Sequence, residues 1–334
     1  MRTTNVLGRY DMNTWKEIPF DYGAEKAAVG GDGGMGGRQA PVISSIFLPA
    51  RSPVCYHQGG MSVNVKGDIA VACHWNNLNE KSKEIVGSAI PDTGKYEALV
   101  FPGRLESNRS VSVHIWDKSG KLKSEDVIKG APQTDGVFID KDCHVYMLAC
   151  PPRQIEGKPI DDGYSSTLIK FRNGSKGRFV SSDKNIPLVL NKEEYPKRPQ
   201  EIKDQWVENY DWMYGGVGYA SFNPGRAGGG CACWHVRFKL DYLGRSFVPS
   251  PILSEISVLD TSGNLILKIG KYGNEDSKGK NSKEPLGGDE VGLFHPCFTA
   301  VHTDRRLFIS DIGNENIMSV KLKYAVDEIL LFKK

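Results

Sequence analysis

The sequence predicts an all-β protein, a β-propeller built from four-stranded antiparallel sheets. Short segments in which apolar and polar residues alternate recur along the chain, and tight turns that often begin with Asp or Asn separate them. No long stretch repeats its apolar residues with the helical period of 3.6. The 334 residues include 37 Gly and 18 Pro, many of them at turn positions.

Four segments share one hairpin pattern, in which an apolar strand, often ending in Asp or Asn, is followed after two or three turn residues by a second apolar strand. They are residues 62–73, 137–150, 237–250 and 298–311. Each is followed by a further unit of similar alternation, at residues 110–122, 166–180, 255–270 and 316–332. Period-2 alternation on both sides of a tight turn indicates β-hairpins, so the repeating unit has four strands.

Four-stranded units that recur every 40–60 residues or so are typical of a β-propeller. A lone four-stranded sheet exposes two edges and cannot bury both faces, whereas radial packing of such sheets covers the faces. We expect one domain over residues 1–334 with six blades. Part of residues 1–50 would close the ring against the C-terminal strands, and residues 75–107 and 183–229 are long insertions.

One short helix is expected, around Glu201–Val207.

Composition excludes several classes of protein. The net charge of +3 is nearly balanced, which indicates no nucleic-acid partner, and no run of about 18 apolar residues could span a membrane. The N-terminal residues contain no apolar segment of the kind found in a signal peptide, and their pattern is typical of the interior of a longer protein. The compartment is undetermined; a location outside the cytoplasm is favoured if a leader has been removed. The seven Cys are an odd number, so at least one is unpaired unless it bonds between chains.

The last unit resembles an NHL-type propeller blade. The residues that carry this resemblance are Pro296, an apolar strand, Asp304, a second apolar strand, and then Asp311, Gly313, Asn314 and Ile317. Asn316 stands where that family usually has Arg.

Over a longer span, from about Lys129 to the C-terminus, the chain resembles NHL-like propeller proteins of planctomycete-type bacteria. The segments that carry this second resemblance are "WMYGGVGYASFN", "CACWHVRFKLDYLGRSFVP", "VLDTSGNLILKIGKYGN" and "DEVGLFHPCFTAVHTDRRLFISDIGN". It implies a fold and no activity.

Three potential metal ligands occupy alternate positions of one expected strand. Cys231, Cys233 and His235 point to one face together with Arg237, because residues two apart share a face of a strand. Thiolates and imidazole suit Zn²⁺ or copper, with a fourth ligand from elsewhere, such as His57 or His295. Alternatively, both Cys are small buried strand residues, or they pair with Cys55 and Cys297.

Superposing the four hairpins aligns His57, Gln133, Trp234 and His295. A propeller brings equivalent positions of its blades together around its axis, so these side chains would ring one mouth of the central channel. Polar and aromatic groups that converge on a concavity predict a binding site. Alternatively, the His and Gln side chains simply solvate a channel entrance.

The segment "QTDGVFIDKDCHVYM" resembles a segment of the gluconolactonase, senescence-marker and LRE-like propellers. The resemblance implies that Asp135, which precedes Gly136, is a ligand of a divalent metal such as Ca²⁺ and a general base. That family also needs an N-terminal Glu and an Asn–Gly ligand segment, and neither has a match here.

These observations favour a non-enzymatic propeller module that binds a small ligand or a partner protein at the channel mouth, either by itself or as part of a larger polypeptide. The expected ligand-binding residues are His57, Gln133, Asp135, Trp234, Arg237 and His295. The alternative is a metal-dependent, lactonase-like hydrolase that uses Asp135.

Overall fold

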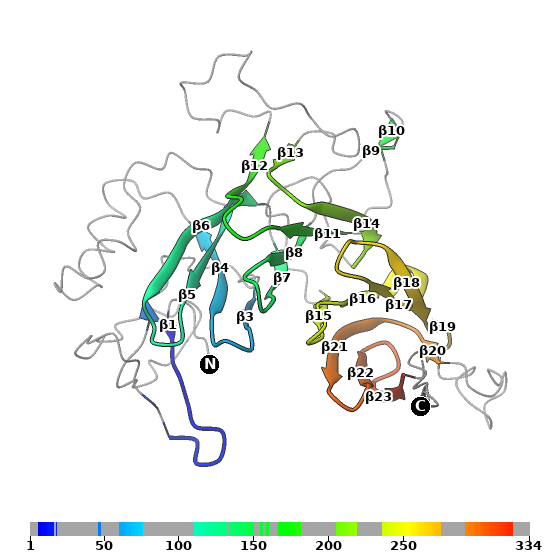
Figure 1. The fold of residues 1–334 in the computed structure, drawn as a ribbon. Helices are drawn as coiled ribbons and strands as arrows, with labels where there is room; N and C mark the ends of the chain where they lie inside the picture. Colours follow the sequence, from blue (N-terminus) through cyan, green and yellow to red (C-terminus); the bar gives the residue numbers. More distant parts are fainter. Residues whose placement is uncertain are drawn as a thin grey trace, which may run out of the picture. The chain divides into compact units, whose positions relative to one another are not determined.

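The fold is all-β in the computed structural model of the chain (Figure 1). The structure describes residues 6–16, 18, 46–47, 60–75, 110–131, 134–149, 154–155, 158–159, 166–181, 205–218, 236–274 and 291–322. Within these ranges the only helical element is a short 3-10 helix, Pro251–Leu253. Among the same residues, no helix is long and apolar enough to cross a membrane. The predicted all-β class with four-stranded antiparallel sheets is confirmed.

The chain divides into two compact units. The first comprises Met1–Gly215 and Ala220–Cys233, and the second comprises Gly216–Tyr219 and Trp234–Lys334. A single six-bladed domain that closes through residues 1–50 stays a prediction.

The first unit contains two large sheets and two short strand pairs. One large sheet has the order β13-β12-β6-β5-β4-β3 and the other the order β14-β11-β8-β7, while β1 pairs with β2 and β9 with β10. The strands are β1 Val6–Leu7, β2 Ile46–Phe47, β3 Met61–Val63, β4 Ile69–Trp75, β5 Ser110–Trp116, β6 Leu122–Ala131, β7 Thr134–Ile139, β8 Val145–Ala149, β9 Gln154–Ile155, β10 Lys158–Pro159, β11 Ser166–Phe171, β12 Gly177–Ser181, β13 Gln205–Glu208 and β14 Trp212–Val217.

The second unit contains a four-stranded sheet of order β15-β16-β17-β18, a three-stranded sheet of order β21-β22-β23 and the parallel pair β19–β20. Its strands are β15 Lys239–Leu240, β16 Ser246–Ser250, β17 Glu255–Leu259, β18 Leu265–Ile269, β19 Lys271–Tyr272, β20 Gly292–Leu293, β21 Pro296–His302, β22 Arg306–Asp311 and β23 Asn316–Lys321.

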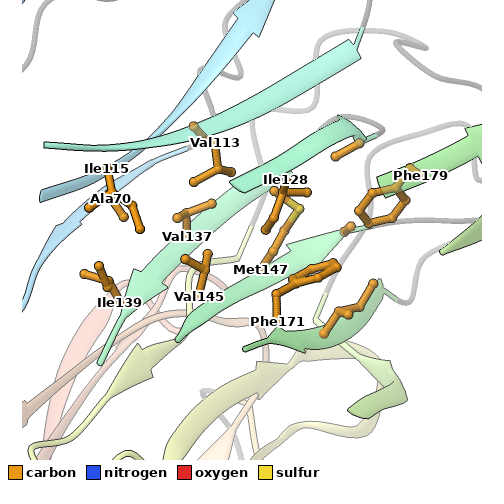
Figure 2. Close-up of a cluster of buried hydrophobic side chains, with 14 of the residues drawn as sticks. Ala70, Val113, Ile115, Ile128, Val137, Ile139, Val145, Met147, Phe171 and Phe179 are labelled. Atoms are coloured by element: carbon orange, nitrogen blue, oxygen red, sulfur yellow. The ribbon is translucent and has the colours of Figure 1, made fainter. Parts of the chain in front are cut away.

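Apolar side chains fill the space between the two large sheets of the first unit. Figure 2 shows Val113, Ile115 and Ile128 of one sheet facing Val137 and Met147 of the other. All five are at most 1% exposed. In the second unit, an equivalent cluster that includes Phe247, Ile256 and Leu307 lies between its two larger sheets. Sheets that cover one another's faces are what the propeller prediction requires.

Two parts of the sequence-based description were wrong. Residues 166–180 do not form one hairpin in a single sheet, since β12 leaves β11 and pairs in parallel with β6. Gly174 and Lys176, in the turn between β11 and β12, both adopt positive φ and change the direction of the chain. As a result, the side chain of Phe179 is buried in the core. The fourth strand beside β11 is instead β14.

Residues 205–208 are the strand β13 and not part of a helix. Val207 pairs with Phe179 across β12 and β13, and burial of this pair outweighs the helical propensity of the neighbouring residues. Within residues 183–229, β13 and β14 each add an edge strand to a large sheet of the first unit, and the prediction of a long insertion there stays a prediction.

A five-residue turn recurs at the hairpins of both units. In each copy, a side-chain oxygen of the first residue accepts the backbone N–H groups of the third and fifth residues. The copies are Asn64–Asp68, Asp117–Lys121, Asp140–His144, Asp241–Arg245 and Asp260–Asn264. These bonds explain why Asp or Asn begins the turns in the sequence.

The fourth residue of the turn adopts a left-handed backbone conformation. It is Gly in four copies, whereas the copy between β7 and β8 has Cys143 with φ 63°. A side chain at positive φ costs about 1–2 kcal/mol, so Cys143 occupies a strained position.

We expect Gly67→Ala to destabilise the first unit more than Gly174→Ala does. Both residues have positive φ, 86° and 77°, but a Cβ at Gly67 would lie 2.7 Å from Lys118 Cβ, while one at Gly174 would meet nothing within 4 Å. Gly174→Ala, the control variant, should therefore lose about 1–2 kcal/mol of unfolding free energy from backbone strain alone. Gly67→Ala should lose about 1 kcal/mol more because of the close contact. Equal losses in urea unfolding would contradict the predicted contact.

Candidate functional site

The turns support the alignment of the four hairpins made from the sequence. His57, Gln133, Trp234 and His295 each lie seven residues before the first residue of a hairpin turn, which is Asn64, Asp140, Asp241 or His302. Two of these turns meet, because Asn64 Nδ2 donates to the Asp140 carbonyl at 2.9 Å. Ser62 Oγ also accepts the Ile139 N–H at 2.8 Å, so the first strands of two hairpins lie side by side in the first unit.

The second unit repeats this arrangement. Arg237 and Phe298 form a parallel bridge, with Arg237 N–H donating to the Cys297 carbonyl and Thr299 N–H donating to the Arg237 carbonyl. Arg237 is exposed, and Phe298 is 37% exposed. An exposed Arg and a partly exposed Phe are therefore bridge partners, one just before β15 and the other in β21.

His295 directly precedes β21 and is fixed through its backbone. Its N–H donates to Asp311 Oδ1 at 2.8 Å, and its carbonyl accepts the Ile312 N–H at 3.1 Å. Burial lowers the pKa of the imidazole and outweighs the nearby Asp311 carboxylate, which acts to raise it. The ring is therefore neutral at neutral pH and offers one donor and one acceptor.

Asp311 is the centre of the motif that resembles an NHL blade. It is fully buried and accepts four backbone N–H groups, from Phe294, His295, Gly313 and Asn314, and a side-chain bond from Asn314 Nδ2. A Cβ on Gly313 would come within 2.5 Å of the Phe294 ring. The motif thus positions the loop that carries His295.

Most of the other predicted site residues lie outside the described residues. These are His57, Gln133, Cys231, Cys233, Trp234 and His235. Asp135 lies in β7, at a bulge between Thr134 and Gly136, and its side chain is also outside the described part. Zn²⁺ or copper binding by the "CACWH" segment therefore stays a prediction.

Cys297 is a buried free thiol, so the alternative in which it pairs with Cys231 or Cys233 is wrong. Burial, followed by the Asp311 carboxylate, raises the pKa of its thiol to about 12.

An acidic cluster that the sequence did not single out lies in the turn between β7 and β8. One ligand atom from each of Asp140, Asp142 and His144 lies within 4.8 Å of the others, a spacing that could hold a metal ion. His144 Nδ1 lies 3.0 Å from Asp140 Oδ2. Asp135 lies near the start of β7, and the cluster follows the end of β7, about 17 Å away along an extended strand. Asp135 and the cluster therefore cannot bind the same ion.

A second cluster joins the two large sheets of the first unit. Asp68 Oδ1 accepts from Lys123 Nζ at 2.9 Å, and Asp68 Oδ2 accepts from Cys143 Sγ at 3.2 Å and from Asn64 Nδ2 at 3.1 Å. Lys123 Nζ also lies 3.4 Å from Cys143 Sγ. Burial, followed by the hydrogen bond to Asp68, raises the pKa of the Cys143 thiol.

Asp68 should contribute to acid sensitivity. Burial acts to raise the pKa of its carboxyl, but hydrogen bonds from Lys123, Cys143 and Asn64 together hold that pKa below its usual range. A carboxyl with a depressed folded-state pKa stabilises the fold above its unfolded pKa and loses this contribution as the pH falls through the folded value. We expect Asp68→Asn to lose less unfolding free energy than the wild type between about pH 5 and pH 2.

The control for this prediction is Asp142→Asn, since Asp142 also has a lowered pKa but is exposed, with 48% of its side chain accessible. Solvent screens such a group, so its replacement should change the acid profile less. Identical profiles for Asp68→Asn and the wild type would contradict the role of Asp68.

No family model matches the chain, and no curated protein matches it. Solved structures give weak likenesses. A candidate gluconolactonase has 7% identity and a TM-score of 0.30 over 78% of this chain, which spans 59% of that protein's length. A gluconolactonase from Xanthomonas campestris has 10% identity and a TM-score of 0.24 over 75% of this chain and 67% of that one.

Virginiamycin B lyase from Staphylococcus aureus has 10% identity and a TM-score of 0.23, over 80% of this chain and 86% of that one. At these scores the likenesses carry no argument about activity or about the placement of the sheets.

Proposed function

We propose that the chain is a non-enzymatic binding module that takes a small anionic ligand, or an acidic group of a partner protein, where the first strands of its hairpins begin. The observation that carries this proposal is the parallel bridge between Arg237 and Phe298. It sets an exposed guanidinium beside an exposed aromatic ring. His295, with a neutral imidazole, stands at the entry of the same strand as Phe298.

The chemistry of these groups defines the ligand class. A guanidinium recognises a carboxylate or phosphate through two parallel hydrogen bonds, and an aromatic face accepts the apolar part of the same molecule. Because Asp311 fixes the backbone of His295, little conformational freedom is lost when a ligand binds there. His57 and Gln133 of the first unit, and Trp234 of the second, are proposed to bind ligand at the equivalent positions of their own hairpins.

A thermal-shift screen tests this proposal. The probes are a panel of sugar acids, other small carboxylates and sugar phosphates, measured on the wild type and on Arg237→Ala and His295→Ala. Stabilisation by a probe should be lost in both variants. His302→Ala is the matched control, because His302 lies on the same strand at its opposite end and is exposed.

The proposed site would be contradicted if no acidic probe raised the melting temperature of the wild type. It would also be contradicted if His302→Ala lost the stabilisation as completely as Arg237→Ala and His295→Ala.

The second candidate function is the metal-dependent hydrolase that uses Asp135. The observation that favours it is the position of Asp135 near the start of β7, where the register of the β7–β8 pair shifts between Thr134 and Gly136. A bound Ca²⁺ would polarise a lactone carbonyl and lower the pKa of a coordinated water. Calcium-dependent opening of an aldonolactone, lost in Asp135→Ala, would establish this activity and displace the binding proposal.

A further inference from the structure

The cluster of Asp68, Lys123 and Cys143 goes beyond the proposed binding site. It lies in the first unit and joins three segments that are far apart in sequence. Asp68 immediately precedes β4 and Lys123 lies in β6 of one large sheet, whereas Cys143 lies in the turn between β7 and β8 of the other. We propose that Lys123 and Cys143 form a covalent cross-link when the protein is exposed to peroxide, and that this bond links the two large sheets of the first unit.

The geometry brings both reacting atoms to one base. Lys123 Nζ and Cys143 Sγ lie 3.4 Å apart, and each donates to a different oxygen of the same carboxylate, at 2.9 Å and 3.2 Å. Asp68 therefore holds the amine and the sulfur in contact and can relay a proton from either during the reaction. The left-handed backbone of Cys143, at a position where four equivalent turns carry Gly, places its Sγ in this contact.

Access to the cluster is one-sided. Cys143 is 6% exposed, while 44% of the Lys123 side chain is exposed. The covered sulfur therefore favours a small oxidant such as a hydroperoxide over a bulky thiol or a second protein. A sulfenic acid formed there has the lysine amine 3.4 Å from its sulfur, as a nitrogen nucleophile already in contact.

The cross-link forms in two steps. The Cys143 sulfur attacks one peroxide oxygen, the O–O bond breaks, and the thiol proton passes through Asp68 to the departing oxygen, leaving a sulfenic acid and an alcohol or water. Lys123 then gives one proton to Asp68, and its nitrogen attacks the sulfenic sulfur. An S–N bond forms, the S–O bond breaks, and water leaves with the second nitrogen proton. Sulfur loses two electrons overall and the peroxide gains them.

Mass spectrometry of the full chain tests the cross-link. Trypsin should release residues 122–129 joined to residues 142–153, because a modified Lys123 is not cleaved. The linked pair should be two hydrogen atoms lighter than the sum of its peptides and should disappear on treatment with dithiothreitol. The experiment uses a Cys150→Ser background, since Cys150 lies in the second peptide. Hydrogen peroxide is the probe, at concentrations that leave the circular dichroism unchanged.

Two comparisons make the result decisive. Lys123→Arg keeps a cation beside Asp68 but removes the primary amine, so its linked pair should be absent while the fold is retained. Cys297, another buried free thiol, serves as an internal reference for oxidation without a cross-link.

Recovery of Cys143 from the oxidised wild type as a free thiol, or as sulfinic acid with no linked pair, would overturn the proposal.

Discussion

Replacement of Asp311 by Ala should destabilise the protein by about 3–5 kcal/mol. Its carboxylate is fully buried and accepts four backbone N–H groups, all of which lose this acceptor in the variant. Each buried donor that is left without an acceptor costs about 1–3 kcal/mol, although water entering the space of the lost carboxylate would satisfy some of them. Urea unfolding followed by tryptophan fluorescence measures the loss.

Asp260→Ala is the matched control for this variant. Asp260 also accepts two backbone N–H groups in a turn, but it is partly exposed, so water can replace its oxygens. Its replacement should cost about 1 kcal/mol. If both variants lose the same free energy of unfolding, Asp311 is not the anchor of the loop that carries His295.

Phe171→Ala should cost about 3–5 kcal/mol, because it removes a large ring from the core between the two sheets of the first unit. Phe171 is 1% exposed, its ring centroid lies 6.2 Å from that of Phe179, and a Cβ on Gly177 would come within 2.2 Å of it. The neighbouring backbone at Gly177 therefore packs directly on the ring, and a cavity would remain where the ring was.

Val65→Ala provides the comparison, since Val65 belongs to the same unit but is 80% exposed in a turn. It should change stability by less than about 0.5 kcal/mol. A loss below about 1 kcal/mol for Phe171→Ala would show that the two sheets do not depend on this contact.

The hairpins were predictable because their signal is local. Alternation and an Asp or Asn at the turn depend on residues close in sequence, and the backbone N–H bonds that Asp140 and Asp241 accept within their own turns confirm this interpretation. The partner of β11 was not predictable, because the choice between β12 and β14 depends on contacts between distant segments. Asp211, for example, places the start of β14 through its N–H bond to the Lys170 carbonyl.

The cluster around Cys143 escaped the sequence analysis for a similar reason. Asp68, Lys123 and Cys143 come from three separate segments, and no motif spaces them. One signal was available, since aligning the turns puts Cys143 in the position that Gly67, Gly120, Gly244 and Gly263 occupy. A side chain where the backbone favours Gly indicates that the side chain itself has a role.

The metal content of the protein, purified without added metal and measured by elemental analysis, tests the central proposal most directly. A binding module that recognises an anion through Arg237 and His295 needs no ion, so we expect less than stoichiometric calcium, zinc and copper. One equivalent of zinc or copper lost in Cys231→Ser would instead establish a metal site in the "CACWH" segment. One equivalent of calcium that Asp135→Ala removes and Asp142→Ala retains would contradict the binding module and support the hydrolase.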